Sequence, residues 1–331
     1  MSVVPFFKQS VARRAHLSLI ILVPLLLCAD RAFPWSQQGH VIIAQAAQTM
    51  LSNNVLKKVQ SILNTNEMSS VALWADQVRQ LMQFKSGPLV GNAEAQQFII
   101  DHPDNDKWHF VNLPLNTFKY LYNGRFADPN DIVHVLTNCI AVLEGDSTFM
   151  TKPQALRVLI HMVGDIHQPL HVACGYYVPN GTGATLLKDP GDILNVEAHD
   201  RGGNSLRING SENSKLHGFW DDNLVQGVDT TPGNKKMLQI VTNAVDTVNW
   251  KNSGSRYTWP AKWAKDAVLE AQMAYDGVTF GPASFKANGE VNHIHITLAG
   301  TYANDRRDQV TRQLAKAAFH LARLLNRIEW D

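Results

Sequence analysis

The chain has few cysteines, which limits how far covalent cross-links can stabilise it. Of its 3 cysteines, Cys28 lies in an N-terminal segment that differs in composition from the rest. The remaining pair, Cys139 and Cys174, can form at most one disulfide. Two alternatives stay open, a single bridge in an oxidising compartment or two free thiols.

The chain also has no marked excess of basic residues, because its 30 Lys and Arg are nearly balanced by 29 Asp and Glu. Residues 1–34 contain four of the basic residues and one of the acidic ones. The rest of the chain therefore has 26 basic and 28 acidic residues, a formal charge near −2. This balance excludes a protein that holds nucleic acid through a broadly basic surface, so any attraction of phosphate must be local.

Long apolar runs are absent except near the N-terminus. The run Leu17–Ala29 follows a basic segment that contains Lys8, Arg13 and Arg14. It is 13 residues long and contains a proline, so it is too short for a membrane span and is typical of a signal peptide. We expect residues 1–34 to be a presequence and residues 35–331 to form an exported monomer without a membrane span, extracellular or, in a bacterium, periplasmic.

Helical periodicity dominates the remainder of the chain, and alternating patterns typical of strands are short and few. The patterns predict helices over 39–64, 69–85, 129–147, 152–168, 233–249, 259–275 and 300–328. The segment 175–213 is rich in Gly, Asn and Asp, and we expect a long loop beside the functional site. The fold is predicted to be mainly α, a single-domain, bundle-like arrangement of helices.

Potential metal ligands are concentrated in two short stretches. His161 and Asp165 are four residues apart in the first, and His217 and Asp221 have the same spacing in the second. Residues four apart on a helix project from one face, so each pair can clamp one ion. Imidazole nitrogen and carboxylate oxygen are ligands that zinc accepts when it keeps a position open for water.

A third histidine extends the first stretch. Pro169 is expected to end the helix near Gln168, so that His171 leaves the helix on a bend and can face a second ion. Two His/Asp pairs and this additional histidine predict a hydrolytic site with several zinc ions, rather than a set of buried structural histidines.

Further motifs lie on the N-terminal side of these stretches. In chain order the full set is Trp35-x4-His40, Trp74-Ala75-Asp76-Gln77-Val78-Arg79, Trp108-His109-Phe110, His161-x3-Asp165-x5-His171, Asp200-Arg201-Gly202-Gly203-Asn204 and His217-x3-Asp221. This order resembles the zinc-dependent single-strand-specific nucleases, which include fungal nucleases, plant bifunctional nucleases and 3′-nucleotidase/nucleases. The resemblance places the chain in the zinc phospholipase C/nuclease superfamily and implies its helical fold.

The resemblance implies a trinuclear zinc cluster. The implied ligands are Asp76, His109, His161 and Asp165 for one ion, His171, His217 and Asp221 for a second, and Asp165, His40 and the α-amino nitrogen and carbonyl oxygen of Trp35 for the third. Pro34 precedes Trp35, and it is a poor match to the small residue that signal peptidases favour. A free Trp35 amine therefore requires a second trimming step, or the third zinc is bound differently.

The activity that the resemblance implies is hydrolysis of single-stranded DNA and RNA to 5′-phosphorylated products, together with release of phosphate from 3′-nucleotides. Asp165 would bridge two ions of the metal cluster. A hydroxide activated by that cluster would attack phosphorus. The resemblance also assigns Arg79 to a phosphate oxygen, which a guanidinium can bind through several donors.

Four residues are candidates for contacts with a nucleobase. Phe110 offers a stacking face to an unpaired base, although core packing is the alternative interpretation. The backbone at Gly203 would approach the base closely, and Asn204 would hydrogen-bond its edge. At Asn112 the fungal members of the family have an Asp that contacts the base, so the resemblance does not imply their base preference for this chain.

Two other functions remain open at this point. A zinc phospholipase C has a similar fold, but it spaces the first histidine farther from its tryptophan and uses Glu where this chain has Asp221. A secreted zinc-binding protein without activity would need the same metal ligands but not Arg79, Phe110 or Asn204.

The remaining histidines and two sequons receive simpler interpretations. His199 is a candidate to orient a metal ligand. Structural roles are expected for His102, His134, His167, His293 and His295. The sequons at Asn180 and Asn209 are glycosylation sites if the source is eukaryotic.

Overall fold

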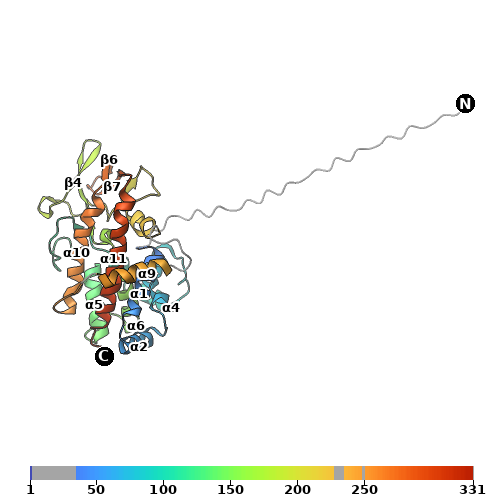
Figure 1. The fold of residues 1–331 in the computed structure, drawn as a ribbon. Coiled ribbons are helices and arrows are strands. Elements are labelled where there is room, and N and C mark those ends of the chain that lie inside the picture. The colour runs from blue at the N-terminus through green and yellow to red at the C-terminus, as the bar shows by residue number, and fades with distance from the viewer. Residues whose placement is uncertain (2–34, 227–234, 248–249, 331) are drawn as a thin grey trace. The chain divides into compact units, whose positions relative to one another are not determined.

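The computed structural model describes Met1 and residues 35–226, 235–247 and 250–330 (Figure 1). The presequence predicted for residues 1–34 lies outside these ranges apart from Met1. Among the described helices, none is both long and apolar enough to cross a membrane.

The described chain is mainly helical, as predicted. The α-helices are α1 (Ser36–Thr49), α2 (Asn53–Leu63), α3 (Trp74–Phe84), α4 (Ala93–Asp101), α5 (Ile132–Glu144), α6 (Lys152–Asp165), α7 (Leu216–Gly218), α8 (Leu224–Gln226), α9 (Lys235–Thr247), α10 (Trp259–Tyr275) and α11 (Tyr302–Leu325). Short 3₁₀ turns are η1 (Met68–Val71), η2 (Asn105–His109), η3 (Pro169–His171), η4 (Pro190–Asp192) and η7 (Arg256–Thr258), and η5 (Phe219–Asn223) is a π-helical turn.

Helix α11 lies against several other helices at the centre of the molecule (Figure 1). One stripe of this helix is apolar and fully buried, with Leu314, Ala318, Leu321 and Leu325 each at 0% exposure. Helices α1, α6 and α9 pack against α11, whose buried residues also include Ala315, Ala317 and Ala322. Each buried leucine contributes roughly 2 kcal/mol by leaving water.

Local signals in the sequence set where the helices begin. Thr151 and Gln154 form a reciprocal capping box at the start of α6, and Asp131 accepts hydrogen bonds from two backbone N–H groups at the start of α5. Pro260 lies in the first turn of α10, whose bounds agree with the predicted 259–275.

The predicted helix 39–64 is wrong, because the chain breaks between α1 and α2. The side chain of Ser52 accepts a hydrogen bond from the backbone N–H of Val55 and starts a new helix. A cap of this kind outweighs continued amphipathic periodicity. In the same way the predicted helix 69–85 is divided into η1 and α3, and α4 was not predicted.

The strands form three small sheets. β1 (Leu113–Pro114) pairs in parallel with β2 (Ala173–Cys174), and β3 (Tyr176–Asn180) pairs antiparallel with β4 (Gly183–Leu187). In the third sheet β7 (Val291–Leu298) lies between β5 (Leu206–Ile208) and β6 (Val278–Phe285).

The expectation of one long loop over 175–213 is therefore wrong in part. This segment contains the hairpin β3–β4 and strand β5. Gly181, with φ +58°, is the first residue of the two-residue hairpin turn, a position where glycine avoids the strain of a side chain. Residues 193–205, between η4 and β5, contain no helix or strand.

Pairing of β1 with β2 joins two of the predicted ligand segments. The N–H of Val111 donates to the carbonyl oxygen of His171 at 2.9 Å, and Nδ1 of His171 lies 2.6 Å from the carbonyl oxygen of His109. His109 and His171, which are 62 residues apart in the sequence, are thus brought into contact beside this strand pair.

Candidate metal centre

Three groups of buried side chains could each hold a metal ion. The groups are His40, His161 and Asp165; Asp76, His109 and His161; and His171, His217 and Asp221. Within each group the potential ligand atoms lie within 4.8 Å of one another. The structure thus brings together all eight side chains that were predicted as ligands.

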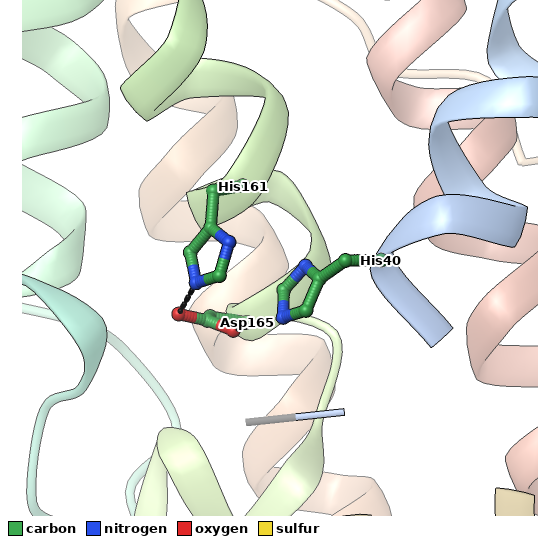
Figure 2. Close-up of side chains that lie close together, drawn as sticks. All are labelled: His40, His161 and Asp165. Atoms are coloured by element: carbon green, nitrogen blue, oxygen red, sulfur yellow. Dashed lines mark ion pairs between the residues drawn. The ribbon is translucent and has the colours of Figure 1, made fainter. Parts of the chain in front are cut away.

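The first group joins helices α1 and α6. Figure 2 shows His161 and Asp165 on successive turns of α6, with His40 reaching them from α1. The two imidazole rings are stacked with their centroids 3.8 Å apart. Nε2 of His40 lies 3.1 Å from Oδ1 of Asp165, while Nε2 of His161 lies 3.3 Å from Oδ2.

The second group adds residues from α3 and η2. Asp76 lies in the first turn of α3, and His109 is the last residue of η2. Nδ1 of His109 is 2.9 Å from Oδ2 of Asp165 and 3.8 Å from Oδ1 of Asp76. Asp165 therefore lies between the first two groups, where a bridging carboxylate was predicted.

The third group combines the turn after α6 with the segment from α7 to η5. α6 ends at Asp165, and Pro169 starts the 3₁₀ turn that carries His171, so the expected bend is confirmed. Nε2 of His217 lies 3.3 Å from Oδ2 of Asp221. Asp221 lies in a π-helical turn, a feature often found at functional sites.

The hydrogen bonding of these side chains fits metal ligation. Buried atoms that make no hydrogen bond among the described residues include both ring nitrogens of His40, both oxygens of Asp76, Nε2 of His161 and Oδ1 of Asp165. Two of these oxygens still have a close ion-pair contact, Oδ1 of Asp76 with Arg79 and Oδ1 of Asp165 with His40. In the third group, Nε2 of His171 and Oδ2 of Asp221 are likewise buried without a hydrogen bond to any described residue. Unpaired buried polar atoms are costly, so their convergence fits cations as partners.

Backbone carbonyls orient three of the histidines. Nδ1 of His161 lies 2.7 Å from the carbonyl oxygen of Ala72, and Nδ1 of His217 lies 2.7 Å from that of Gly202. His171 makes the corresponding contact described above. A carbonyl can only accept, so each Nδ1 carries the hydrogen and Nε2 is left as the ligand atom.

Burial also influences protonation in the site. It lowers the pKa of His109 and of His217 to about 4, so both rings are neutral near pH 7, the form that binds metal. Burial raises the pKa of Asp221 to about 7, because a carboxylate loses hydration there. For His161, burial opposes protonation, but Asp165 and Asp76 outweigh it and raise the pKa to about 9.

Trp35 is fully buried beside these groups. Its indole N–H donates to the carbonyl oxygen of Gly164 at 2.8 Å, and its backbone nitrogen lies 3.2 Å from Oδ1 of Asp221. The contact with Asp221 was not predicted from the sequence.

The residues predicted to contact substrate differ in exposure. Arg79 is partly exposed, and its Nη2 lies 2.9 Å from Oδ1 of Asp76. The ring of Phe110 is 37% exposed, directly after His109. The backbone carbonyl oxygen of Asn112 accepts a hydrogen bond from the hydroxyl of Tyr176.

Gly203 and Asn204 belong to a turn that supports His217. The side chain of Asn204 donates to the carbonyl oxygen of Arg201 at 3.0 Å, which closes the turn. Gly203 is buried, and its N–H donates to Oδ1 of Asp200 at 2.9 Å. The predicted approach of a base to Gly203 and Asn204 stays a prediction.

Sequence reasoning missed two buried residues that orient the ligands. Asp200 accepts hydrogen bonds from Gly175, Gly203, Tyr177 and Tyr275 and so fixes the turn whose Gly202 carbonyl faces His217. Gln168 donates to Oδ1 of Asp221 at 2.8 Å. The motif that begins at Asp200 could have indicated the role of Asp200. For Gln168, the only indication in the sequence was its position between Asp165 and His171.

Cys139 and Cys174 are free thiols in the structure, which is one of the two alternatives that the sequence left open. Cys139 is buried on α5 in the main core, whereas Cys174 lies in a separate cluster with Tyr176 and Ile193. The bridge named above as one alternative is therefore absent, because the two residues pack in different apolar clusters.

Most of the other histidines make structural contacts. His167 pairs with His320 at 2.7 Å and with the carbonyl oxygen of Val163. His134 contacts Asp131 and Tyr120.

His102 packs among aromatic rings, and His293 stacks on His295 in β7. His199 accepts a hydrogen bond from the backbone N–H of Arg201, at the turn that faces His217.

The chain is similar to known proteins over most of its length. The S1/P1 nuclease family model matches residues 35–329. Endonuclease 2 of Arabidopsis thaliana is 26% identical over 335 residues, covering 94% of this chain and 96% of the relative. Nuclease S1 of Aspergillus oryzae is 23% identical over 318 residues, with 94% and 97% covered, and nuclease P1 of Penicillium citrinum is 23% identical over 312 residues, with 89% and 97% covered.

The family match and these relatives define a hydrolase, and the structure gives it a candidate metal centre. The chain belongs to the S1/P1 nuclease family. The predicted resemblance and the predicted enzyme class are confirmed by this match.

Proposed function

We propose that this chain is an exported, monomeric zinc-dependent endonuclease that cleaves single-stranded DNA and RNA and leaves 5′-phosphorylated products. We also propose that it removes phosphate from 3′-nucleotides. One observation carries the proposal: eight buried His and Asp side chains converge in three groups, and six of them have a buried atom that makes no hydrogen bond among the described residues, in a chain of the S1/P1 nuclease family.

The proposed division of the chain is a presequence over 1–34 and a catalytic domain over 35–331. Three zinc ions would occupy the three groups, with Trp35 adding main-chain ligands to the group of His40 and Asp165. When bound, zinc supplies an activated water and neutralises phosphate charge.

The protein's own residues would position the substrate. Arg79 lies beside Asp76 and is partly exposed, so its guanidinium can donate to a non-bridging phosphate oxygen while it keeps its contact with Asp76. Phe110 presents part of its ring next to His109, where an unpaired base can stack on it. A duplex cannot expose the face of a base, which accounts for the proposed preference for single strands.

The proposal is tested by a timed digest of single-stranded DNA, single-stranded RNA and the matching DNA duplex. Each digest is run with and without a zinc chelator, and the end groups of the products are identified. A 3′-nucleotide and a phosphatidylcholine micelle serve as further substrates.

Chelator-sensitive release of 5′-phosphorylated products, faster from the single strands, is the expected result. Cleavage of the phospholipid alone would replace the proposal with a phospholipase activity. Full zinc occupancy without turnover of any substrate would reduce the chain to a zinc-binding protein.

The proposed role of the Trp35 amine needs a separate measurement. Mass spectrometry of the exported protein should give Trp35 as the N-terminal residue. A fully active protein that begins at any other residue would exclude the α-amino nitrogen as a ligand.

A further inference from the structure

Gln168 lies between two of the proposed ligands and is fully buried. It follows Asp165 by three residues and precedes His171 by three. Its side-chain oxygen accepts a hydrogen bond from the backbone N–H of Leu170 at 2.6 Å. The side chain therefore caps the 3₁₀ turn that carries His171.

The other end of the same amide reaches a distant part of the chain. Nε2 of Gln168 donates to Oδ1 of Asp221 at 2.8 Å, across 53 residues of sequence. The orientation of the amide follows from its partners, because the N–H of Leu170 can only donate and must face the amide oxygen. The amide nitrogen then has to face Asp221.

The two oxygens of Asp221 consequently have different surroundings. Oδ1 faces two donors, the amide of Gln168 and the backbone nitrogen of Trp35 at 3.2 Å. Oδ2 is buried without a hydrogen-bond partner among the described residues and lies 3.3 Å from Nε2 of His217. Nε2 of His171 lies 4.0 Å from Oδ1, so Oδ2 is the oxygen that has no donor and is closer to another proposed ligand atom.

We propose that Gln168 is a positioning residue that makes Asp221 a ligand through Oδ2 alone. The same side chain fixes the turn of His171, so it sets two of the three ligands of this group at once. The inference rests on the proposed metal centre. Loss of such a supporting hydrogen bond typically weakens metal affinity about 10- to 100-fold.

Three variants separate the bond to Asp221 from the capping of the turn. Gln168→Glu keeps an oxygen for the N–H of Leu170, and it is measured at a pH where its carboxyl is ionised and has no hydrogen to donate to Asp221. Gln168→Met removes both contacts at similar volume. Gln154→Met is the matched control, because Gln154 also caps a helix through its amide oxygen, at the start of α6, and belongs to none of the three groups.

The variants are compared with the parent chain by zinc titration of the metal-free protein against a chromophoric chelator. The visible absorption spectrum of the cobalt-substituted proteins reports ligand geometry, and thermal unfolding without metal reports fold stability. We expect both Gln168 variants to bind one zinc ion per chain about 10- to 100-fold more weakly and to show an altered cobalt spectrum. Gln154→Met should change the unfolding temperature only.

Parent-like zinc binding and cobalt spectrum in Gln168→Glu would overturn the proposal, because capping of the turn would then suffice. Equal losses of zinc in Gln154→Met would overturn it as well, by tracing the effect to general stability. A parent chain that binds zinc but cleaves no nucleic acid would refute the proposed function and leave the Gln168 comparison valid. A parent that binds no zinc at this group would overturn both.

Discussion

The indole N–H of Trp35 donates a 2.8 Å hydrogen bond to the carbonyl oxygen of Gly164, the residue before Asp165. Two glycines on facing helices allow this contact. A Cβ atom on Gly39 of α1 would lie 2.9 Å from Cβ of Trp35, and one on Gly164 of α6 would lie 2.8 Å from Nδ1 of His40. The close approach of α1 and α6 is therefore a condition for the first ligand group.

Replacement of Gly164 should displace His40. Overpacking in Gly164→Ala costs about 1–3 kcal/mol, while the higher helix propensity of alanine returns about 1 kcal/mol. We expect a net loss of up to about 2 kcal/mol in the free energy of unfolding by denaturant, and weaker zinc binding. Gly218→Ala in α7 is the control, because a Cβ there meets no atom within 4 Å; equal stability of the two variants would refute the predicted clash.

The ligands could be predicted from the sequence because their signal is local. His161 and Asp165 are one helical turn apart, and Pro169 marks the bend before His171, so short-range geometry determines where these side chains point. The helix over 259–275 is likewise set by its own periodicity and by Pro260. The break at Ser52 was missed, since a single side-chain cap competes there with an uninterrupted apolar pattern.

The supports of the ligands could not be predicted, because they depend on packing between distant segments. Gln168 meets Asp221 across 53 residues, and Asp200 meets Tyr275 across 75. No periodicity or spacing in the sequence records such a contact. The hairpin β3–β4 was missed for a related reason, since its composition of Gly, Asn and Asp is also that of loops.

Another glycine, Gly202, supports the third ligand group through the same kind of close approach. A Cβ on Gly202 would lie 1.9 Å from the carbonyl oxygen of Leu170, directly before His171. Gly202→Ala must therefore move the turn of His171 or the carbonyl that faces His217. We expect it to lower stability by about 1–3 kcal/mol more than a control without the clash, and to weaken zinc binding.

The chain offers that control in Gly181. Its φ of +58° is nearly that of Gly202, +59°, but a Cβ on Gly181 meets no atom within 4 Å. Both alanine variants thus carry the same backbone strain, and their difference in urea unfolding isolates the contact with Leu170. Indistinguishable unfolding midpoints and zinc contents would show that the turn at Gly202 tolerates a side chain.

Arg79 is expected to act on the phosphate rather than on metal binding. Loss of one preorganised donor to the developing charge typically lowers turnover about 10²- to 10³-fold, and we expect that loss in Arg79→Ala with unchanged zinc content. Arg157→Ala is a matched control, since Arg157 has the same side-chain exposure of 18% and pairs with Glu94 at 2.8 Å. Loss of zinc in Arg79→Ala would instead assign Arg79 to the orientation of Asp76.

Phe110 should contribute to the affinity for single strands and not to the metal centre. Stacking of one base on an aromatic ring is worth about 1–3 kcal/mol, so Phe110→Ala is expected to weaken binding roughly 5- to 150-fold. The measurement is the Kd for a cleavage-resistant phosphorothioate oligonucleotide, with zinc content and unfolding temperature determined in parallel. Phe118→Ala is the control, because that ring is 72% exposed and has no predicted role. The contrary outcome is that Phe110→Ala lowers the unfolding temperature and leaves the Kd for the oligonucleotide at the parent value. That result would show that the ring serves core packing, since removal of a ring that stacks on a base must weaken binding.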